Sequence, residues 1–528
     1  MSDQVVGHGV QEDDERLLHR LGYAQVLYRE MGGFSNFAIS FTIISILAGC
    51  LTSYSIAYNQ GGPVAITWGW LIVGLFCTFV ALALGEIAST YPTAGGLYFW
   101  SSKLGSPAWG WFTGWFNLVG QIAVTAAIAY GCAFFMTSLL NLLWGYPNSF
   151  GWIYFLYGII LLGAGLINMF RVSITAFLNN VSAWWHMIGV VVIVFVLGIV
   201  PDHHRSISYV FGQTVNNSGF GGQSWTHGVF IYVFLTGLLM AQYTITGYDA
   251  SAHMSEETRR ASRAAAWGIV MSVVVSVIFG FILLVAVTFA IPSAKGPADT
   301  GLFVVTSIWE SSMGRRWAEF LLFIAVVAQC FCTTASVTSA SRMMFAFSRD
   351  RAVPGHRLWR RVSRRERVPI YTVTAVCVLS FLLVVPSLWF GYTGYVVATS
   401  VAVIGLYIAF VLPIILRLRA GARFEPGAWS LGRHYKWIDS LAILWIVFIS
   451  VVFFAPFAYA GIPWNKGFDW NLFNYTIVTV GGAFVLFGGW YVLSARRWFK
   501  GPVREGTEEE LERIEAGFGA VPTRTAEA

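Results

Sequence analysis

The chain contains 528 residues, of which 56% are hydrophobic and 11% charged, and its formal net charge is +7. Soluble domains carry about 25% charged residues, so this composition excludes a soluble protein and predicts an integral membrane protein. Twelve apolar runs approach the length of about 20 residues that a membrane-spanning helix requires. They cover residues 36–60, 64–88, 108–140, 152–170, 176–200, 226–254, 267–291, 317–347, 370–389, 391–418, 438–460 and 473–497.

The basic residues predict how the twelve spans are oriented. If consecutive spans cross the membrane in alternate directions, few of the 33 Lys and Arg residues lie opposite the N-terminus: Arg205, Lys295, Arg315, Arg316 and Lys466. By the positive-inside rule, both termini then lie in the cytoplasm, and the protein resides in the plasma or inner membrane. The densest basic run, Arg357–Arg367, is interpreted as a topology anchor beside anionic lipid and not as a nucleic-acid site.

The polar segments at the two ends lie outside the twelve spans. We divide the chain into a cytoplasmic N-terminal segment (residues 1–34), a twelve-helix membrane domain (35–498) and a cytoplasmic tail (499–528). Helical spacing of the apolar residues in Leu17–Met31 predicts an amphipathic helix at the membrane surface or, alternatively, a loosely ordered segment. The acidic run Glu508–Glu515 predicts a short solvated helix or disorder, and no function is assigned to it.

Two of the spans contain residues that interrupt an apolar helix. In the first span, Leu47–Cys50 and Thr52–Ser55 combine small and hydroxyl residues, and the sixth span carries Gly247–Asp249 near its middle. An unpaired backbone amide in hydrocarbon costs roughly several kcal/mol, so a helix that opens here must face a water-filled cavity. Broken helices at the start of two five-helix halves predict an inverted-repeat transporter. The alternative is two continuous helices that use Ser and Thr for packing.

The two breaks supply backbone groups that suit a zwitterion. An interrupted helix leaves free N–H groups where its second half begins and free C=O groups where its first half ends, and the helix dipole adds partial charge to both. We expect the amides near Ala48 and Gly49 to bind a carboxylate. The ammonium group is expected at the carbonyls near Ser45, Tyr243 and Thr246. An amino acid or a related amine is therefore the predicted substrate.

Asp249 and His186 are ionisable residues that the sequence places deep inside spans. Asp249 is predicted to pair with the substrate ammonium or to act as a protonatable gate. His186 lies in the fifth span, and the ordinary pKa of an imidazole suits a proton-coupled cycle, although a lone histidine also serves as a packing residue. Other intramembrane polar groups that are candidates for lining the same cavity are Gln121, Thr333, Thr334 and Ser336.

The residues around the sixth-span break carry a family resemblance. The run Gln242–Thr258 closely resembles the span-six signature of the amino acid/choline transporter family, within the amino acid, polyamine and organocation (APC) superfamily. GABA permeases and fungal choline transporters belong to that family. The resemblance covers residues 17 to about 500. Three further stretches agree with the family: Leu21–Tyr23, Glu86–Trp100, and Asn179–Asn180 with Trp184–His186.

The resemblance implies an all-α, LeuT-like fold that works by alternating access. Ten helices form two inverted repeats of five, helices 1 and 6 are discontinuous, and two extra helices follow. On this sequence, the family's carboxylate-binding loop falls on Leu47, Ala48 and Gly49. Leu47 and Ala48 replace a glycine and a serine that are common there, so one hydroxyl contact to the carboxylate is lost.

The resemblance also implies roles for residues in three other spans. The carbonyl site falls on Tyr243–Gly247 and the acidic position on Asp249, and Gln121 falls where a relative has an amide that faces the substrate. His186 lies where proton-using relatives have a lysine, so His186 and Asp249 are the residues expected to couple transport to protons. The predicted substrate-binding residues are Ser45, Leu47, Ala48, Gly49, Cys50, Gln121, Tyr243, Thr246, Gly247, Tyr248 and Asp249.

These expectations describe a secondary active transporter that imports an amino acid or related amine, with GABA as the first candidate and protons as the coupling ion. One alternative is a choline or polyamine carrier, in which Asp249, Tyr243, Tyr248 and Trp184 surround a cation. A second is a nutrient sensor that binds without transport. We expect no enzyme, metal or cofactor, because the sequence contains no metal-ligand, nucleophile or nucleotide-loop motif. The predicted partners are the solute, protons and the bilayer, and not nucleic acid.

Overall fold

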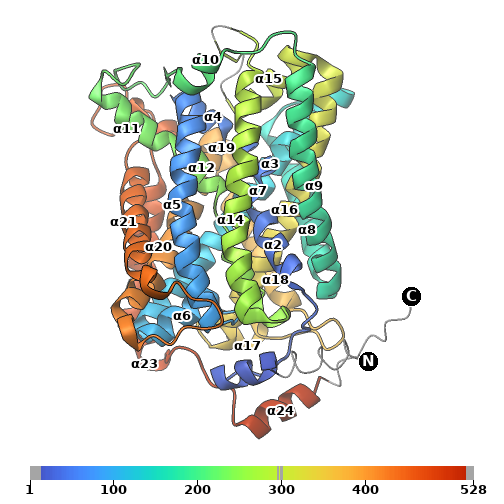
Figure 1. Cartoon of the computed structure of the whole chain (residues 1–528), viewed down its shortest axis with the longest axis vertical. Helices are drawn as coiled ribbons and strands as arrows, with labels where there is room; N and C mark the ends of the chain where they lie inside the picture. The colour runs from blue at the N-terminus through green and yellow to red at the C-terminus, as the bar shows by residue number, and fades with distance from the viewer. Residues whose placement is uncertain (1–12, 294–295, 298–300, 519–528) are drawn as a thin grey trace.

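The computed structural model describes residues 13–293, 296–297 and 301–518, and it is predominantly helical (Figure 1). The beginning of the predicted N-terminal segment and the end of the predicted tail lie outside these residues. In the described part, eleven helical segments are long and apolar enough to cross a membrane. They correspond to eleven of the twelve predicted spans. The sixth span is represented by a shorter apolar helix, Gly228–Thr244, because it is interrupted.

The spanning segments vary in length, and several of them consist of consecutive helices. In chain order they are α2 (Gly33–Ile44) with α3 (Ile46–Thr52), α5 (Pro63–Thr90), α7 (Pro107–Trp144), α8 (Phe150–Asn168), α9 (Val172–Ile199), α14 (Ala261–Phe289), α16 (Arg315–Arg349), α18 (Ile370–Leu383) with α19 (Ser387–Phe390), α20 (Tyr392–Ala420), α21 (Tyr435–Phe454), and α22 (Thr476–Trp490) with the π-helix η6 (Tyr491–Ala495) and α23 (Arg496–Trp498).

Shorter elements form the interrupted sixth span, the connections between spanning helices and the described part of the tail. The sixth span consists of α11 (Gly228–Gly237), α12 (Leu239–Thr244) and α13 (Ala250–His253). The other short α-helices are α4 (Tyr54–Asn59), α6 (Gly96–Leu104), α10 (Ile207–Gly212), α15 (Val304–Met313), α17 (His356–Trp359) and α24 (Glu508–Ala516). The 3-10 helices are η1 (Ser255–Glu257), η2 (Gly421–Arg423), η3 (Gly432–His434), η4 (Tyr459–Gly461) and η5 (Trp470–Leu472). Strands β1 (Gln60–Gly61) and β2 (Val215–Asn216) pair antiparallel, with Gln60 opposite Asn216.

The spanning helices run side by side between two ends of the molecule (Figure 1). One end carries α10, α11 and α15, and we call it the distal face. The opposite end carries α6, α17, α24 and a helix at residues 13–21, and we call it the terminal face. The two segments that flank the membrane domain in sequence therefore lie at the same end.

Burial separates central helices from outer helices. In the most apolar stretch of each segment, 89% of the residues are buried in α2–α3 and in α7, against 28% in α8 and 17% in α22–α23. The outer helices expose large apolar side chains, such as Phe155 and Val485, as expected where a helix contacts lipid. The interrupted first span therefore lies inside the protein, where irregular backbone is tolerated in a membrane.

Candidate functional site

The first spanning helix is interrupted at Ser45. This residue separates α2 from α3, and its φ of 36° lies in the left-handed region that side-chain-bearing residues rarely adopt. Its hydroxyl accepts a hydrogen bond from the backbone amide of Ala48, with N and Oγ 3.2 Å apart. Ser45 therefore caps the N-terminus of α3, as serine commonly does for a helix.

The loop predicted at Leu47–Gly49 lies two residues beyond the observed break at Ser45, whereas the interruption predicted at Thr52–Ser55 is present, with Ser53 between α3 and α4. All three residues of the predicted loop lie inside α3, as does Cys50, because leucine and alanine favour a helix whereas Ser45 can cap one. The amides of Ala48 and Gly49, predicted to bind a carboxylate, both donate to the Ser45 carbonyl. Among the residues that the structure describes, the amides without a carbonyl acceptor in the first turn of α3 are those of Ile46 and Leu47.

The sixth span is interrupted where the sequence predicts it. Helix α12 ends at Thr244 and α13 begins at Ala250, so five residues, Ile245–Asp249, leave the helix. Gly247 has a φ of 87°, a conformation that glycine adopts without the strain that a Cβ imposes. The Thr246 hydroxyl donates to the Gln242 carbonyl and satisfies one acceptor at the end of α12.

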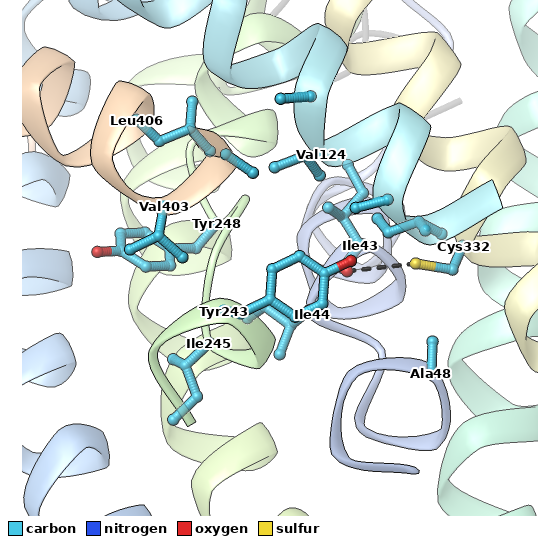
Figure 2. Packing of buried hydrophobic residues seen from close by; sticks show 14 of the residues in the cluster. Ile43, Ile44, Ala48, Val124, Tyr243, Ile245, Tyr248, Cys332, Val403 and Leu406 are labelled. Carbon is cyan, nitrogen blue, oxygen red and sulfur yellow. Dashed lines mark hydrogen bonds between the residues drawn. The ribbon is translucent and has the colours of Figure 1, made fainter. Parts of the chain in front are cut away.

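The two breaks contact one another through glycines. A Cβ at Gly247 would lie 2.4 Å from Cγ2 of Ile43 in α2, and a Cβ at Gly49 would lie 2.6 Å from the Thr244 side chain in α12. Each broken helix thus approaches the other at a residue without a side chain. Figure 2 shows Ile43 and Ile44 of the first break beside the Tyr243 ring, which projects from the sixth span. The predicted juxtaposition of the two discontinuities is therefore present.

One face of α16 lies along the first break. Cys332 donates its thiol to the Ile43 carbonyl at 3.3 Å, and Gln329 donates its amide to the Leu47 carbonyl at 3.4 Å. Ser336 lies one helical turn beyond Cys332, and its buried hydroxyl has no hydrogen-bond partner among the described residues. Of the three α16 residues predicted to line a cavity, Ser336 is the one whose hydroxyl is not bonded within its own helix.

Thr333 and Thr334 use their hydroxyls differently from Ser336. They donate to the carbonyls of Gln329 and Cys330, one turn earlier in α16. Thr334 also lines an apolar groove on the outside of the helix bundle, together with Leu139, Phe323 and neighbouring residues. The structure therefore does not bring Thr334 to the two breaks.

His186 in α9 is hydrogen-bonded to the first break. Its Nε2 lies 2.7 Å from the Ser45 hydroxyl, and its Nδ1 lies 2.8 Å from the Ser182 carbonyl. A carbonyl only accepts, so Nδ1 carries a hydrogen, and in the neutral ring Nε2 accepts the Ser45 proton. The imidazole is fully buried. His186 thus orients the hydroxyl that caps α3.

Asp249 is fully buried at the end of the second break, and three nitrogen atoms lie within hydrogen-bond distance of its Oδ2. The donors are Asn117 Nδ2 at 3.1 Å and Gln121 Nε2 at 2.9 Å, both from α7, and the third partner is His253 Nε2 at 3.2 Å. Asp249 Oδ1 has no hydrogen-bond partner in the described part of the chain. The Gln121 amide, predicted to face the substrate, therefore binds Asp249 in this conformation.

The sequence interpretation missed Asn117 and His253. Each lies four residues from a residue that it identified: Asn117 precedes Gln121, and His253 follows Asp249. Residues four apart share one face of a helix, so this spacing is the signal that would have found both.

The aromatic residues proposed to form a cation cage lie apart. The Tyr243 ring is close to the Tyr395 ring, with centroids 6.4 Å apart, whereas Tyr248 packs against Phe410 of α20. In Figure 2 the two tyrosine rings diverge from the sixth-span break. Trp184 is 56% exposed on the outside of α9. The three rings predicted to surround a cation therefore do not converge in this conformation.

Ion pairs fasten the second half of the broken sixth span at the terminal face. Glu256 pairs with Arg349, and Glu257 with Arg342, each at 2.8 Å and each nearly fully buried. Arg29 of the N-terminal segment donates to the carbonyls of Ser255 and Thr258. A buried ion pair is costly to break from one side, so η1 is held firmly against α16.

Asp350, directly after α16, joins three segments at the terminal face. Its carboxylate accepts hydrogen bonds from the hydroxyls of Tyr23 and Tyr98 and from the backbone amide of Val503. Burial raises the pKa of Asp350 to about 6, against the opposing effect of the Arg349 guanidinium. The N-terminal segment, α6 and the C-terminal tail are thus bound to one buried carboxyl group.

The C-terminal tail, as far as residue 518, is packed against the rest of the protein and not merely solvated. Within α24, Leu511 is fully buried against Ala24, Leu27 and Phe345. Glu515 binds His19 at 2.7 Å. The helix predicted from the acidic run is present, and its apolar side packs against the N-terminal segment and α16 at the terminal face.

Comparison with known proteins identifies similar sequences. Residues 31–484 match the model of a family described as amino acid permease. The chain is 38% identical to the amino-acid permease BAT1 of Arabidopsis thaliana over 514 residues, 94% of this chain and 97% of that protein. It is 38% identical to the BAT1 homolog of Oryza sativa subsp. japonica over 95% of this chain and 98% of that one. It is 27% identical to the GABA-specific permease of Saccharomyces cerevisiae over 94% of this chain and 87% of that protein.

Gly247→Ala tests whether the contact between the breaks requires glycine. The added Cβ meets both a left-handed φ and the Ile43 side chain, so we expect a loss of about 1–3 kcal/mol in stability. The measurement is the melting temperature of the purified protein in detergent. Gly163→Ala in α8 is the control, because nothing lies within 4 Å of its added Cβ. Equal melting temperatures for the two variants would contradict this account.

The protonation of Asp350 predicts a dependence of stability on pH. The folded carboxyl keeps its proton to about pH 6, whereas its ordinary pKa is 3.8. The folded state therefore binds more protons, and stability is lost as pH rises from about 4 to about 6. We expect Asp350→Asn, which does not ionise, to gain melting temperature relative to the wild type across this interval. A difference from the wild type that does not change with pH, or an equal gain in the exposed control Asp202→Asn, argues against a buried titrating group at position 350.

Proposed function

The chain belongs to the amino acid permease family, and from this premise we propose that it imports an amino acid or related amine by proton-coupled secondary transport. Alternating access around the two breaks is the proposed mechanism. The observation that carries the proposal is the contact of two interrupted helices at Gly49 and Gly247, inside the most buried part of the protein. The terminal face is the proposed cytoplasmic side, in agreement with the distribution of basic residues.

We propose that the substrate binds between the start of α3 and the end of α12. The first amides of α3, those of Ile46 and Leu47, suit a carboxylate, and the carbonyls that end α12, at Tyr243 and Thr244, suit an ammonium group. These positions are supported by their proximity across the Gly49–Thr244 contact. A zwitterion complements both ends at once, which favours an amino acid over a simple cation.

GABA is the first candidate substrate, and a choline or polyamine carrier is the alternative. The Saccharomyces relative is named a GABA-specific permease, and the Arabidopsis relative an amino-acid permease. The divergence of Tyr248 and Trp184 from Tyr243 favours amino acids, because a choline cage requires aromatic faces around one point. The remaining alternative, a sensor, uses the same site without solute movement.

Protons are the proposed coupling ion, and Asp249 and His186 are the candidate residues. Both are fully buried and each is bonded to a break: Asp249 ends the second break, and His186 binds Ser45 in the first. A change of protonation at either residue alters a hydrogen bond that fixes a broken helix. This connection supports a cycle in which proton binding and helix rearrangement occur together.

Uptake into proteoliposomes tests the proposed function. With labelled GABA, alanine, glutamate, lysine and choline offered separately, we expect accumulation of an amino acid severalfold above equilibrium under an inward-directed proton gradient. Collapse of the gradient with an ionophore is expected to abolish accumulation and to leave equilibration. Accumulation of choline alone would favour the alternative carrier. Binding of a solute without uptake would identify a sensor and contradict transport.

A further inference from the structure

Asp249 and His253 form a buried pair inside the broken sixth span. His253 ends α13, four residues after Asp249, and both side chains are inaccessible to solvent. His253 Nε2 lies 3.2 Å from Asp249 Oδ2, and His253 Nδ1 lies 2.9 Å from the carbonyl oxygen of Ala94, in the loop between α5 and α6. Both ring nitrogens of His253 therefore face oxygen atoms of acceptor groups.

To satisfy both contacts, a hydrogen is needed between each ring nitrogen of His253 and its oxygen partner. A neutral imidazole carries only one, so the pair needs one additional proton. The Ala94 carbonyl cannot donate, so Nδ1 carries a hydrogen. Nε2 and Oδ2 then need a hydrogen between them, either on the imidazole or on the carboxyl group. Asn117 and Gln121 also direct donors at Oδ2 and provide no proton that can be exchanged. The pair thus holds a single exchangeable proton, shared by two residues.

The bonding of His186 is different. Its second nitrogen faces the Ser45 hydroxyl, which can donate as well as accept, so the neutral ring satisfies both partners without an extra proton. His186 therefore suits a positioning role at the first break. The hydrogen-bond partners therefore distinguish the two buried histidines: the contacts of His253 require an additional proton, and those of His186 do not.

We infer that Asp249 and His253 together form the proton-binding site of the transport cycle, an assignment that rests on the proposed function. The ligand of this site is one proton per cycle. Of the two coupling candidates, Asp249 belongs to the site and His186 does not. His253 enters as a second proton-binding residue.

The groups packed around the pair leave it without another compensating charge. On its own segment, Glu256 pairs with Arg349 and Glu257 with Arg342, both from α16. The other elements in contact with α13 contribute uncharged residues: Asn36 and Ser40 of α2, Gly268 of α14, Asn117 and Gln121 of α7, and Ala94 and Gly96 of the α5–α6 connection. Among the described residues, His253 is thus the side chain bonded to Asp249 that is able to carry a positive charge.

A chain of contacts connects this site to the terminal face. The Ala94 carbonyl accepts from His253, and the amide of the same residue donates to Glu256 at 2.9 Å. Glu256 in turn pairs with Arg349. The proton-bound pair therefore belongs to the conformation described here, in which the terminal face is closed by ion pairs. Loss of the proton leaves two acceptors facing each other, which favours separation of His253 from Asp249 and opening toward the terminal face.

The direction of proton movement follows from this arrangement. The site takes a proton while the terminal face is closed and releases it when that face opens. If the terminal face is cytoplasmic, the proton moves inward together with the solute, which is symport and not exchange.

His253→Gln in the full-length protein tests the assignment, with His186→Gln as the matched control. Labelled GABA, alanine, glutamate and lysine serve as probes in proteoliposomes, and the solute that the wild type exchanges fastest is used throughout. Solute exchange without a gradient reports transport, and an internal pH dye reports proton entry on addition of solute. We expect His253→Gln to retain exchange within about threefold but to lose at least tenfold in gradient-driven accumulation and to lose the proton signal. His186→Gln is expected to slow exchange, because His186 binds the Ser45 hydroxyl that caps α3, but to keep the proton signal for each solute molecule that enters.

The outcomes separate the inference from the proposed function. Undiminished proton dependence in His253→Gln, or its loss in His186→Gln alone, overturns the assignment while transport stands. Absence of exchange in the wild type contradicts the proposed function itself. If His253→Gln does not fold, the ratio of protons to solute in the wild type, obtained from reversal potentials, decides. One proton beyond the charge of the solute supports a single shared site, and zero or two protons overturn it.

Discussion

The need to satisfy backbone polar groups away from water governs the centre of this protein. Helices α2 and α12 end within the bundle, where each exposed carbonyl or amide must find a partner. Side chains supply part of what the interrupted helices lack: the Ser45 hydroxyl caps α3, the Thr246 hydroxyl binds the end of α12, and the Cys332 thiol binds the Ile43 carbonyl. The backbone groups that remain at the two breaks are the ones available to a solute, so one constraint both shapes the helices and defines the candidate site.

Where the two breaks are in close contact, the Asp249 carboxylate is buried and needs hydrogen-bond donors. Because Gly49 and Gly247 let the two helices touch, Asp249 is enclosed, and a buried carboxylate is stable only with donors around it. Donors from α7 and the His253 imidazole fulfil this requirement. The same segment continues into Glu256, which pairs with Arg349. The interior site and the ion pairs at the terminal face therefore share one stretch of chain.

Local sequence predicted those features that depend on a residue's own chemistry. Gly247 and Asp249 were sufficient to place the second break, because glycine permits the left-handed backbone and a carboxylate does not enter lipid. The first break was misplaced because Ser45 and Gly49 both interrupt apolar sequence, and the choice between them depends on a hydrogen bond to His186 from another helix. Thr334 was misassigned for a similar reason, since the sequence of α16 does not reveal which side faces the outer groove.

The sequence by itself thus determined an all-helical membrane protein, the interruption of the sixth span and the presence of a buried acid, because hydrophobicity and backbone preference act locally. Tertiary structure alone decided that Gln121 binds Asp249, that His253 completes the proton site we infer, and that α24 packs over the terminal face. These relations join residues on separate segments or on opposite sides of a helix end. Their partners are fixed by how helices pack in three dimensions, which the order of residues along one helix does not reveal.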